Sequence, residues 1–106
     1  MDETRYHQIA EECINALAAL LEPYDEDGTL DVELQDGVLT IILPANKQLL
    51  ISKHAASRQI WLASPISGGL HFSYNGTDWT LPNGRALNAV LAQELKALAN
   101  LIVVFA

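Results

Sequence analysis

Acidic side chains are concentrated in the first third of the chain. Residues 25–36 read DEDGTLDVELQD and hold six carboxylates in twelve positions. Residues 1–36 hold eleven Asp and Glu residues and one base, Arg5, whereas residues 37–106 hold two acids and five Lys or Arg residues. Such segregation creates a negative field that attracts cations and basic protein surfaces and repels polyanions. We therefore expect no nucleic-acid partner, because phosphate contacts need clustered Lys and Arg.

Several of these carboxylates would share one surface if the opening helix packed beside the strand that follows it. The members of this acidic ridge are Glu3, His7, Glu11 and Glu22 on one flank of the helix, Asp25, Glu26 and Asp27 in the loop, and Asp31 and Glu33 on the strand. Asp31 and Glu33 would lie roughly 7 Å apart, since each strand residue rises about 3.3 Å. Oxygen ligands suit ferrous iron, Mn²⁺, Mg²⁺ or Ca²⁺, and His7 favours a transition metal. Because exposed carboxylates lack a closed, supported geometry, we expect weak and exchangeable binding.

More specific motifs do not match. An EF-hand loop beginning at Asp25 would need glycine where Leu30 stands, and one beginning two residues earlier would start with Pro23. The chain has no HExxH or CxxC spacing for zinc and no glycine-rich phosphate loop. Its histidines and serines form no recognisable catalytic motif, so we do not predict an enzyme.

A purely structural interpretation of the acids stays open at this point. Acidic faces of small proteins are most often simply solvated, and Asp31 with Glu33 would keep an edge strand soluble. The residues alone also allow a metal-independent acidic module that binds other proteins.

The periodicity of apolar residues predicts the elements that position the acids. From Asp2 to about Leu21, apolar residues recur at three-four spacing, which is typical of an amphipathic helix. Asp2 is a plausible N-cap, and Pro23 is expected to limit the helix at its other end. A second helix is predicted from about Ala86 to Ala99, before the apolar tail LIVVFA.

Strand signals fill the region between the two helices. The apolar residues Leu30, Val32 and Leu34 alternate with Asp31 and Glu33, which predicts a half-buried strand with its acids on the opposite face. Asp36-Gly37, Pro44-Ala45-Asn46, Pro65–Gly69, Asn75-Gly76 and Pro82-Asn83-Gly84 read as turns or breaks. The further strands predicted between them span residues 38–43, 48–52, 59–64, 70–74 and 78–81.

This order of elements predicts an α+β fold. We expect one domain, residues 1–106, in which an antiparallel sheet of about six strands is covered on one face by the N- and C-terminal helices. Cys13 is the only cysteine, so no internal disulfide can form, and its helical position suggests a buried thiol. The acidic start MDETRYHQ and the lack of any apolar run near ~18 residues predict no membrane partner and a cytoplasmic protein, or else one that has already been processed.

At residues 59–72, QIWLASPISGGLHF, the chain resembles the frataxin family, and in particular its bacterial, CyaY-type members. Further similar segments are YHQIAEECINAL, LDVELQDGVLTI, the short strand with Trp79, and LNAVLAQELKAL. The resemblance runs from the first helix to the last. It implies a sheet packed against two terminal helices and no catalytic pocket.

The resemblance also implies a function. Family members bind iron weakly through the acidic ridge, and in bacteria they associate with the cysteine desulfurase and the scaffold protein of iron-sulfur cluster assembly, as iron donor or iron-dependent regulator. Other divalent cations are expected to substitute for iron, and we expect a monomer that iron can convert into oligomers. The metal positions that this chain shares with the family are Glu3, His7, Glu11, Glu22, Asp25, Asp27, Asp31 and Glu33. Ala18, Ala19, Pro23 and Thr29 replace acids of many relatives, so fewer metals are expected here.

The resemblance assigns the partner surface as well. The ridge, here Asp31 and Glu33, is thought to meet basic residues of the desulfurase. The family keeps the ring of Trp61 on the exposed face of the sheet, and Gln59 shares that side by alternation. An exposed aromatic of this kind is a good interface anchor.

Overall fold

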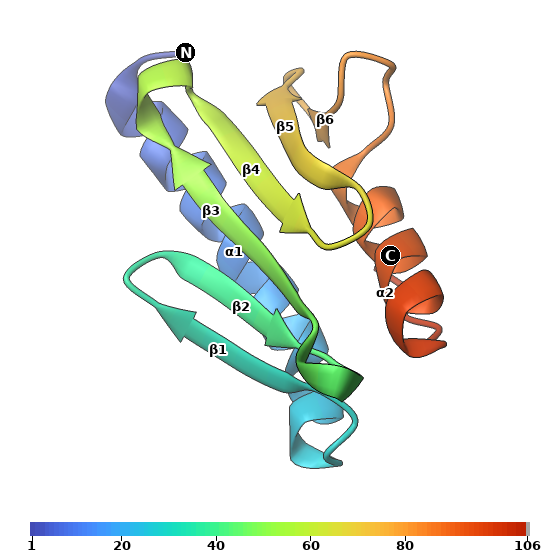
Figure 1. The fold of residues 1–106 in the computed structure, drawn as a ribbon. Helices are drawn as coiled ribbons and strands as arrows, with labels where there is room; N and C mark the ends of the chain where they lie inside the picture. Colours follow the sequence, from blue (N-terminus) through green and yellow to red (C-terminus); the bar gives the residue numbers. More distant parts are fainter. Residues whose placement is uncertain (106) are drawn as a thin grey trace.

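The computed structural model describes residues 1–105 and contains one antiparallel sheet and two helices. The strands are hydrogen-bonded in sequence order, β1-β2-β3-β4-β5-β6. In Figure 1 both helices lie behind the sheet, α1 along β3 and α2 on the side of β5 and β6. In chain order the elements are α1 (Glu3–Glu26), β1 (Asp31–Gln35), β2 (Val38–Ile42), η1 (Pro44–Asn46), β3 (Gln48–His54), η2 (Ala55–Ser57), β4 (Gln59–Ser64), β5 (Gly68–Tyr74), β6 (Trp79–Thr80) and α2 (Leu87–Ala99). The predicted α+β fold with six strands is confirmed.

The first helix is longer than predicted. Asp2 is its N-cap, as expected, and the Asp2 side chain accepts a hydrogen bond of 2.7 Å from the amide of Arg5. The expectation that the helix stops near Leu21 was wrong, because α1 runs through Pro23 to Glu26. Proline removes one backbone donor, but the carbonyl of Pro23 still accepts from the amide of Asp27 at 3.1 Å and closes a last turn. Glu22 and Asp25 are therefore helical residues.

Turn chemistry explains where the first hairpin reverses. Asp36 and Gly37 both have positive φ, 54° and 77°, as a two-residue hairpin turn with the twist of the flanking strands requires. The predicted turn at Pro44–Asn46 is a short 3₁₀ helix. The remaining strand boundaries differ from the predicted ones by two residues or fewer at each end, which is the scale on which helix and strand ends are ordinarily uncertain.

Alternation along the strands divides the sheet into a covered and an open face. Buried residues of the covered face pack with the apolar stripes of α1 and α2 in one core. The largest fully buried side chains of that core are Tyr6, Phe72, Ile14, Leu17, Leu21, Leu39, Ile41, Leu49, Ile51, Ile60, Leu62 and Leu87. Each contributes about 1.5–3 kcal/mol when it leaves water, so this layer holds α1 against the sheet and thereby positions the acidic residues.

The edge strand β1 is less covered than its pattern predicts. Leu30 is buried and Val32 is half-buried, but Leu34 is 44% exposed, so the expectation that all three would be sheltered was wrong for Leu34. On the helix side Leu34 borders a shallow depression with Ala18 and Ala19. The small alanine side chains do not reach far enough to cover Leu34.

The chain turns at Asn100, which has a φ of 51°, and residues 101–105 follow α2 without regular secondary structure. Val103 is buried against the core, whereas its neighbours Ile102 and Val104 are exposed. Within the described part of the chain, neither helix has the length and apolar character needed to cross a membrane.

Candidate metal and partner site

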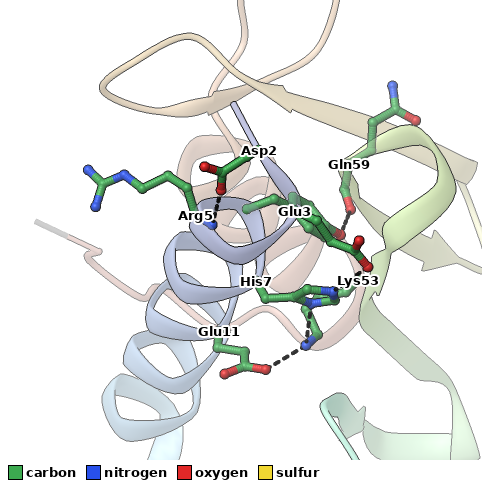
Figure 2. Close-up of polar contacts among 8 residues, drawn as sticks. Asp2, Glu3, Arg5, His7, Glu11, Lys53 and Gln59 are labelled. Carbon is green, nitrogen blue, oxygen red and sulfur yellow. Dashed lines mark hydrogen bonds and ion pairs between the residues drawn. The ribbon is translucent and has the colours of Figure 1, made fainter.

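The start of α1 carries three of the predicted metal ligands in one row. Glu3, His7 and Glu11 succeed one another at intervals of four residues and face β3, as Figure 2 shows. The Nε2 atom of His7 lies 3.7 Å from Oε1 of Glu3. Sequence reasoning placed these three residues together correctly.

A basic residue that sequence reasoning missed joins this row. The ammonium of Lys53 donates to Oε1 of Glu11 at 2.6 Å and contacts Nδ1 of His7 at 3.2 Å. The Lys53 hydrogen bond and charge hold the pKa of Glu11 below its ordinary value. A signal existed in the sequence: the period-two run Leu49, Ile51, Lys53 places a lysine on the apolar side of β3, where its charge must find a partner.

Two acids at the junction of α1 and β1 serve the local structure. Asp25 is half-buried, and its Oδ2 accepts a hydrogen bond of 3.1 Å from the backbone amide of Val32. Oδ1 of Asp27 accepts from the amide of Thr29 at 2.9 Å, and these contacts with Thr29 lower the pKa of the Asp27 carboxyl. Both carboxylates therefore shape the turn between helix and strand, and each keeps a second oxygen for a cation.

The remaining acids lie around the β1 edge. Glu22 and Asp25 border the depression on the helix side of β1, together with Val32 and Leu34. Asp31 and Glu33 alternate with Val32 and pair with Ile42 and Thr40, so they belong to the open face, as predicted. Asp31 also borders a second shallow depression that Asp25 lines.

The predicted metal ligands of α1 and β1 form an acidic edge, but their side chains do not converge on one common metal position. In residues 1–105 no three His, Cys, Asp or Glu side chains approach closely enough to hold one metal ion together. Helix α1 contacts β3 beside the Glu3–His7–Glu11 row and also contacts β1, whereas Asp31 and Glu33 point from β1 to the open face of the sheet. A negatively charged surface of this kind attracts cations.

Trp61 lies on the open face of the sheet, with an imidazole against each side of its ring. The rings of His54 and Trp61 are stacked with centroids 3.7 Å apart, and those of Trp61 and His71 with centroids 4.1 Å apart. The Nε1 atom of Trp61 donates to Oε1 of Gln59 at 3.0 Å. The predicted partner residues Gln59 and Trp61 thus contact each other, and the indole is half-buried rather than fully exposed.

Sequence reasoning gave His54 and His71 no role. Their contact with Trp61 follows from strand pairing, because His71 is the partner of Trp61 in the β4-β5 register and His54 lies on β3 opposite Gln59. Trp79, by contrast, is buried beside Tyr6 and Tyr74 and serves the core. Burial raises the pKa of the Cys13 thiol to about 11, which makes the thiolate scarce at neutral pH.

Comparison with solved structures finds close relatives of this fold. The frataxin from Psychromonas ingrahamii, described as a model for stability modulation within the CyaY protein family, has a TM-score of 0.88 at 22% sequence identity and covers 100% of this chain and 99% of that one. At that identity the likeness shows the fold. Trimeric frataxin from the yeast Saccharomyces cerevisiae, complexed with ferrous iron, has a TM-score of 0.76 at 31% identity, over 95% of this chain and 88% of that one.

Comparison with curated sequences and families agrees. The mitochondrial frataxin homolog of Saccharomyces cerevisiae is 38% identical over 96 residues, which cover 87% of this chain and 55% of that protein. The chain thus spans about half the length of that relative. The model of the frataxin-like domain matches residues 1–101, nearly the whole chain, and this protein therefore belongs to the frataxin family.

Proposed function

We propose that this protein is an iron-binding accessory protein of iron-sulfur cluster assembly, of the bacterial CyaY type and acting in the cytoplasm. It would deliver iron, regulate the cysteine desulfurase in response to iron, or do both. The observation that carries the proposal is the acidic edge at which Glu22, Asp31 and Glu33 are exposed and, within residues 1–105, form no ion pair. Carboxylates without a protein counter-charge are available to a hard divalent cation.

Family membership adds support for iron as the cation. A yeast relative at 31% identity was solved with ferrous iron, and that protein is trimeric. For the present chain we propose a monomer that binds iron weakly and exchangeably and that iron can convert into oligomers. Other divalent cations would compete, because exposed carboxylates discriminate little between hard ions.

A titration with metal ions tests the proposed site. Ferrous iron under anaerobic conditions, or Co²⁺, is added while the amide signals of the labelled protein are recorded. We expect perturbations centred on Glu22, Asp25, Asp27, Asp31 and Glu33. The variant Asp31→Asn with Glu33→Gln should weaken them, whereas the control Asp78→Asn, an exposed acid on the β5-β6 turn, should not. Perturbations confined to residues outside 3–36 would show that the site is elsewhere.

The second part of the proposal concerns partners. The acidic edge, with Asp31 and Glu33, would meet basic residues of the cysteine desulfurase, and Trp61 with Gln59 on the open face would contact the desulfurase or the scaffold protein. Charge reversal at Asp31 and Glu33 should weaken association with the desulfurase, and added salt should do the same, because exposed charges are screened over about 8 Å near physiological ionic strength.

The alternative function is that of a metal-independent acidic module that binds other proteins. The Lys53 contact supports this alternative. Part of the ridge already has a protein cation as partner. Desulfurase activity and association measured with and without iron separate the two functions. Equal effects of Asp31→Lys with Glu33→Lys in both conditions would support the alternative, and an iron-dependent change would support iron-dependent regulation.

A further inference from the structure

Lys53 is held in place by the fold rather than free at the surface. It pairs with Ile60 in the β3-β4 register, so its side chain leaves the sheet on the covered face, where Ile51 and Leu49 precede it. A Cβ built on Gly37 would lie 3.7 Å from Cε of Lys53, which shows that the lysine stem passes beside the β1-β2 turn. The side chain is only 20% exposed, and its ammonium reaches His7 and Glu11 of α1.

The ammonium of Lys53 uses the lone pairs that a metal ion would need. It contacts Nδ1 of His7 and Oε1 of Glu11 together, as the dashed lines in Figure 2 show. An ammonium can only donate, so Nδ1 of His7 must be the acceptor and the ring proton is then on Nε2, which faces Glu3. A metal ion at Nδ1 of His7 would have to displace the ammonium, and a metal ion at the second oxygen of Glu11 would be repelled by the ammonium at close range.

We propose that Lys53 is the resident cation of the Glu3–His7–Glu11 row and that it excludes divalent metal ions from this half of the acidic edge. Cations attracted to the edge are thereby confined to the half formed by Glu22, Asp25, Asp27, Asp31 and Glu33. The confinement of cations to that half rests on the proposed function, whereas the exclusion of metal ions by Lys53 does not. Lys53 is then a residue that determines where on the edge a metal binds.

The charges around this lysine agree with that role. The only basic residue of α1, Arg5, contributes its backbone amide to the N-cap Asp2 and is exposed. Glu11 is 56% exposed, so water can reach its second oxygen, and the Lys53 hydrogen bond and charge lower its pKa. The simpler alternative is that Lys53 and Glu11 form an ordinary surface ion pair, which a competing cation displaces easily.

The test compares three proteins: the wild type, Lys53→Met, which keeps most of the aliphatic stem and removes the charge, and the control Lys47→Met. Lys47 is exposed and precedes β3. Co²⁺ chloride alone is titrated into each protein while the imidazole signals of His7 and the amides of residues 3–11 are recorded by NMR. Circular dichroism verifies folding, and Lys53→Gln replaces the methionine variant if that variant does not fold.

We expect His7 of the wild type and of Lys47→Met to stay unperturbed at Co²⁺ concentrations that perturb His7 of Lys53→Met. The affinity of Co²⁺ at His7 should rise by about tenfold or more without the ammonium, the order expected when a unit charge about 4 Å from a divalent ion is removed. Adding His7→Gln to Lys53→Met should abolish this gain.

Each outcome bears on one of the two ideas. Equal Co²⁺ affinity at His7 in the wild type and in Lys53→Met would overturn the exclusion by Lys53. If the wild type shows no Co²⁺ effect anywhere but Lys53→Met gains a site at His7, the exclusion is supported and the proposed iron-binding function fails. If Co²⁺ perturbs residues 22–33 of every variant and His7 only without Lys53, both ideas are supported.

Discussion

Oδ2 of Asp25 accepts a hydrogen bond of 3.1 Å from the backbone amide of Val32, which ties the last turn of α1 to the edge strand β1. An edge strand has unpaired backbone donors and acceptors, and this carboxylate occupies one of the donors of β1. Helix and strand are thus joined at the position where the acidic edge passes from one to the other.

Replacing Asp25 should loosen that junction. Asp25→Ala removes the acceptor from a half-buried amide and should lower the free energy of unfolding by about 1–2 kcal/mol, measured by urea denaturation. Asp25→Asn keeps an acceptor oxygen and should cost less. Hydrogen exchange at the amide of Val32 should accelerate in Asp25→Ala and not in the neighbouring control Glu26→Ala. Unchanged exchange at the amide of Val32 in Asp25→Ala would mean that the hydrogen bond to Asp25 does not protect the edge strand β1.

The phenol of Tyr6 is a second tie between α1 and the sheet. Tyr6 is fully buried, and its hydroxyl donates to the carbonyl of Gln59 at 2.7 Å. Tyr6→Phe keeps the packing and leaves that carbonyl without its donor, which should cost about 0.5–1.5 kcal/mol in unfolding free energy. Tyr24→Phe is the control, because no hydrogen bond of the Tyr24 hydroxyl is found within residues 1–105. Equal stability of the two variants would count against a role for the Tyr6 bond.

The stack on the open face should respond to loss of either imidazole. His71→Ala removes a ring 4.1 Å from Trp61 and should cost about 0.5–1.5 kcal/mol of stability, the usual contribution of an aromatic pair. Acrylamide should quench more of the tryptophan fluorescence in this variant, because the side of the Trp61 ring that His71 covers becomes accessible while Trp79 stays buried. Thr40→Ala, also on the open face, serves as the control. Unchanged quenching would show that His71 does not shield the indole.

The Lys53–Glu11 pair should make stability depend on pH in the acid range. The pKa of Glu11 is lower in the folded protein than its ordinary value of 4.5, so the pair stabilises the fold above that pH and its contribution is lost as the pH falls through the folded value. The urea midpoint of the wild type should exceed that of Glu11→Gln near pH 7, and the difference should close in the acid range. Glu12→Gln, an exposed neighbour, should show no such convergence with the wild type. A difference that stays constant with pH would contradict the assignment.

Cations should stabilise the folded protein. The crowded carboxylates of residues 1–36 repel one another, and both salt and divalent ions reduce that repulsion. The melting temperature should rise with NaCl, and it should rise further with MgCl₂ at equal ionic strength, because a bound ion adds stability by mass action. The triple variant Glu22→Gln, Asp31→Asn, Glu33→Gln should lose the extra effect of Mg²⁺. A melting temperature independent of both salts would contradict the prediction.

Local patterns were sufficient for most of the fold. Three-four spacing located both helices, alternation and turn residues located six strands, and Asp2 was recognised as the N-cap, because these features depend on neighbours within a few residues. The end of α1 was missed because Pro23 is tolerated in a last turn that the bond from the Asp27 amide to the Pro23 carbonyl closes and the bond between Asp25 and Val32 joins to β1. The exposure of Leu34 was missed because it depends on the small alanines of a helix elsewhere in the sequence.

Charge counts and apolar periodicity are properties of the chain, and they were enough to predict the residues of the acidic edge and the fold class. The folded structure was needed to show which of those acids already have partners. Lys53 meets His7 from 46 residues away, and His54, Trp61 and His71 stack because two strand registers align them. Such contacts depend on how strands pair and how α1 docks, and no local pattern in the chain specifies the distance between two side chains on different elements.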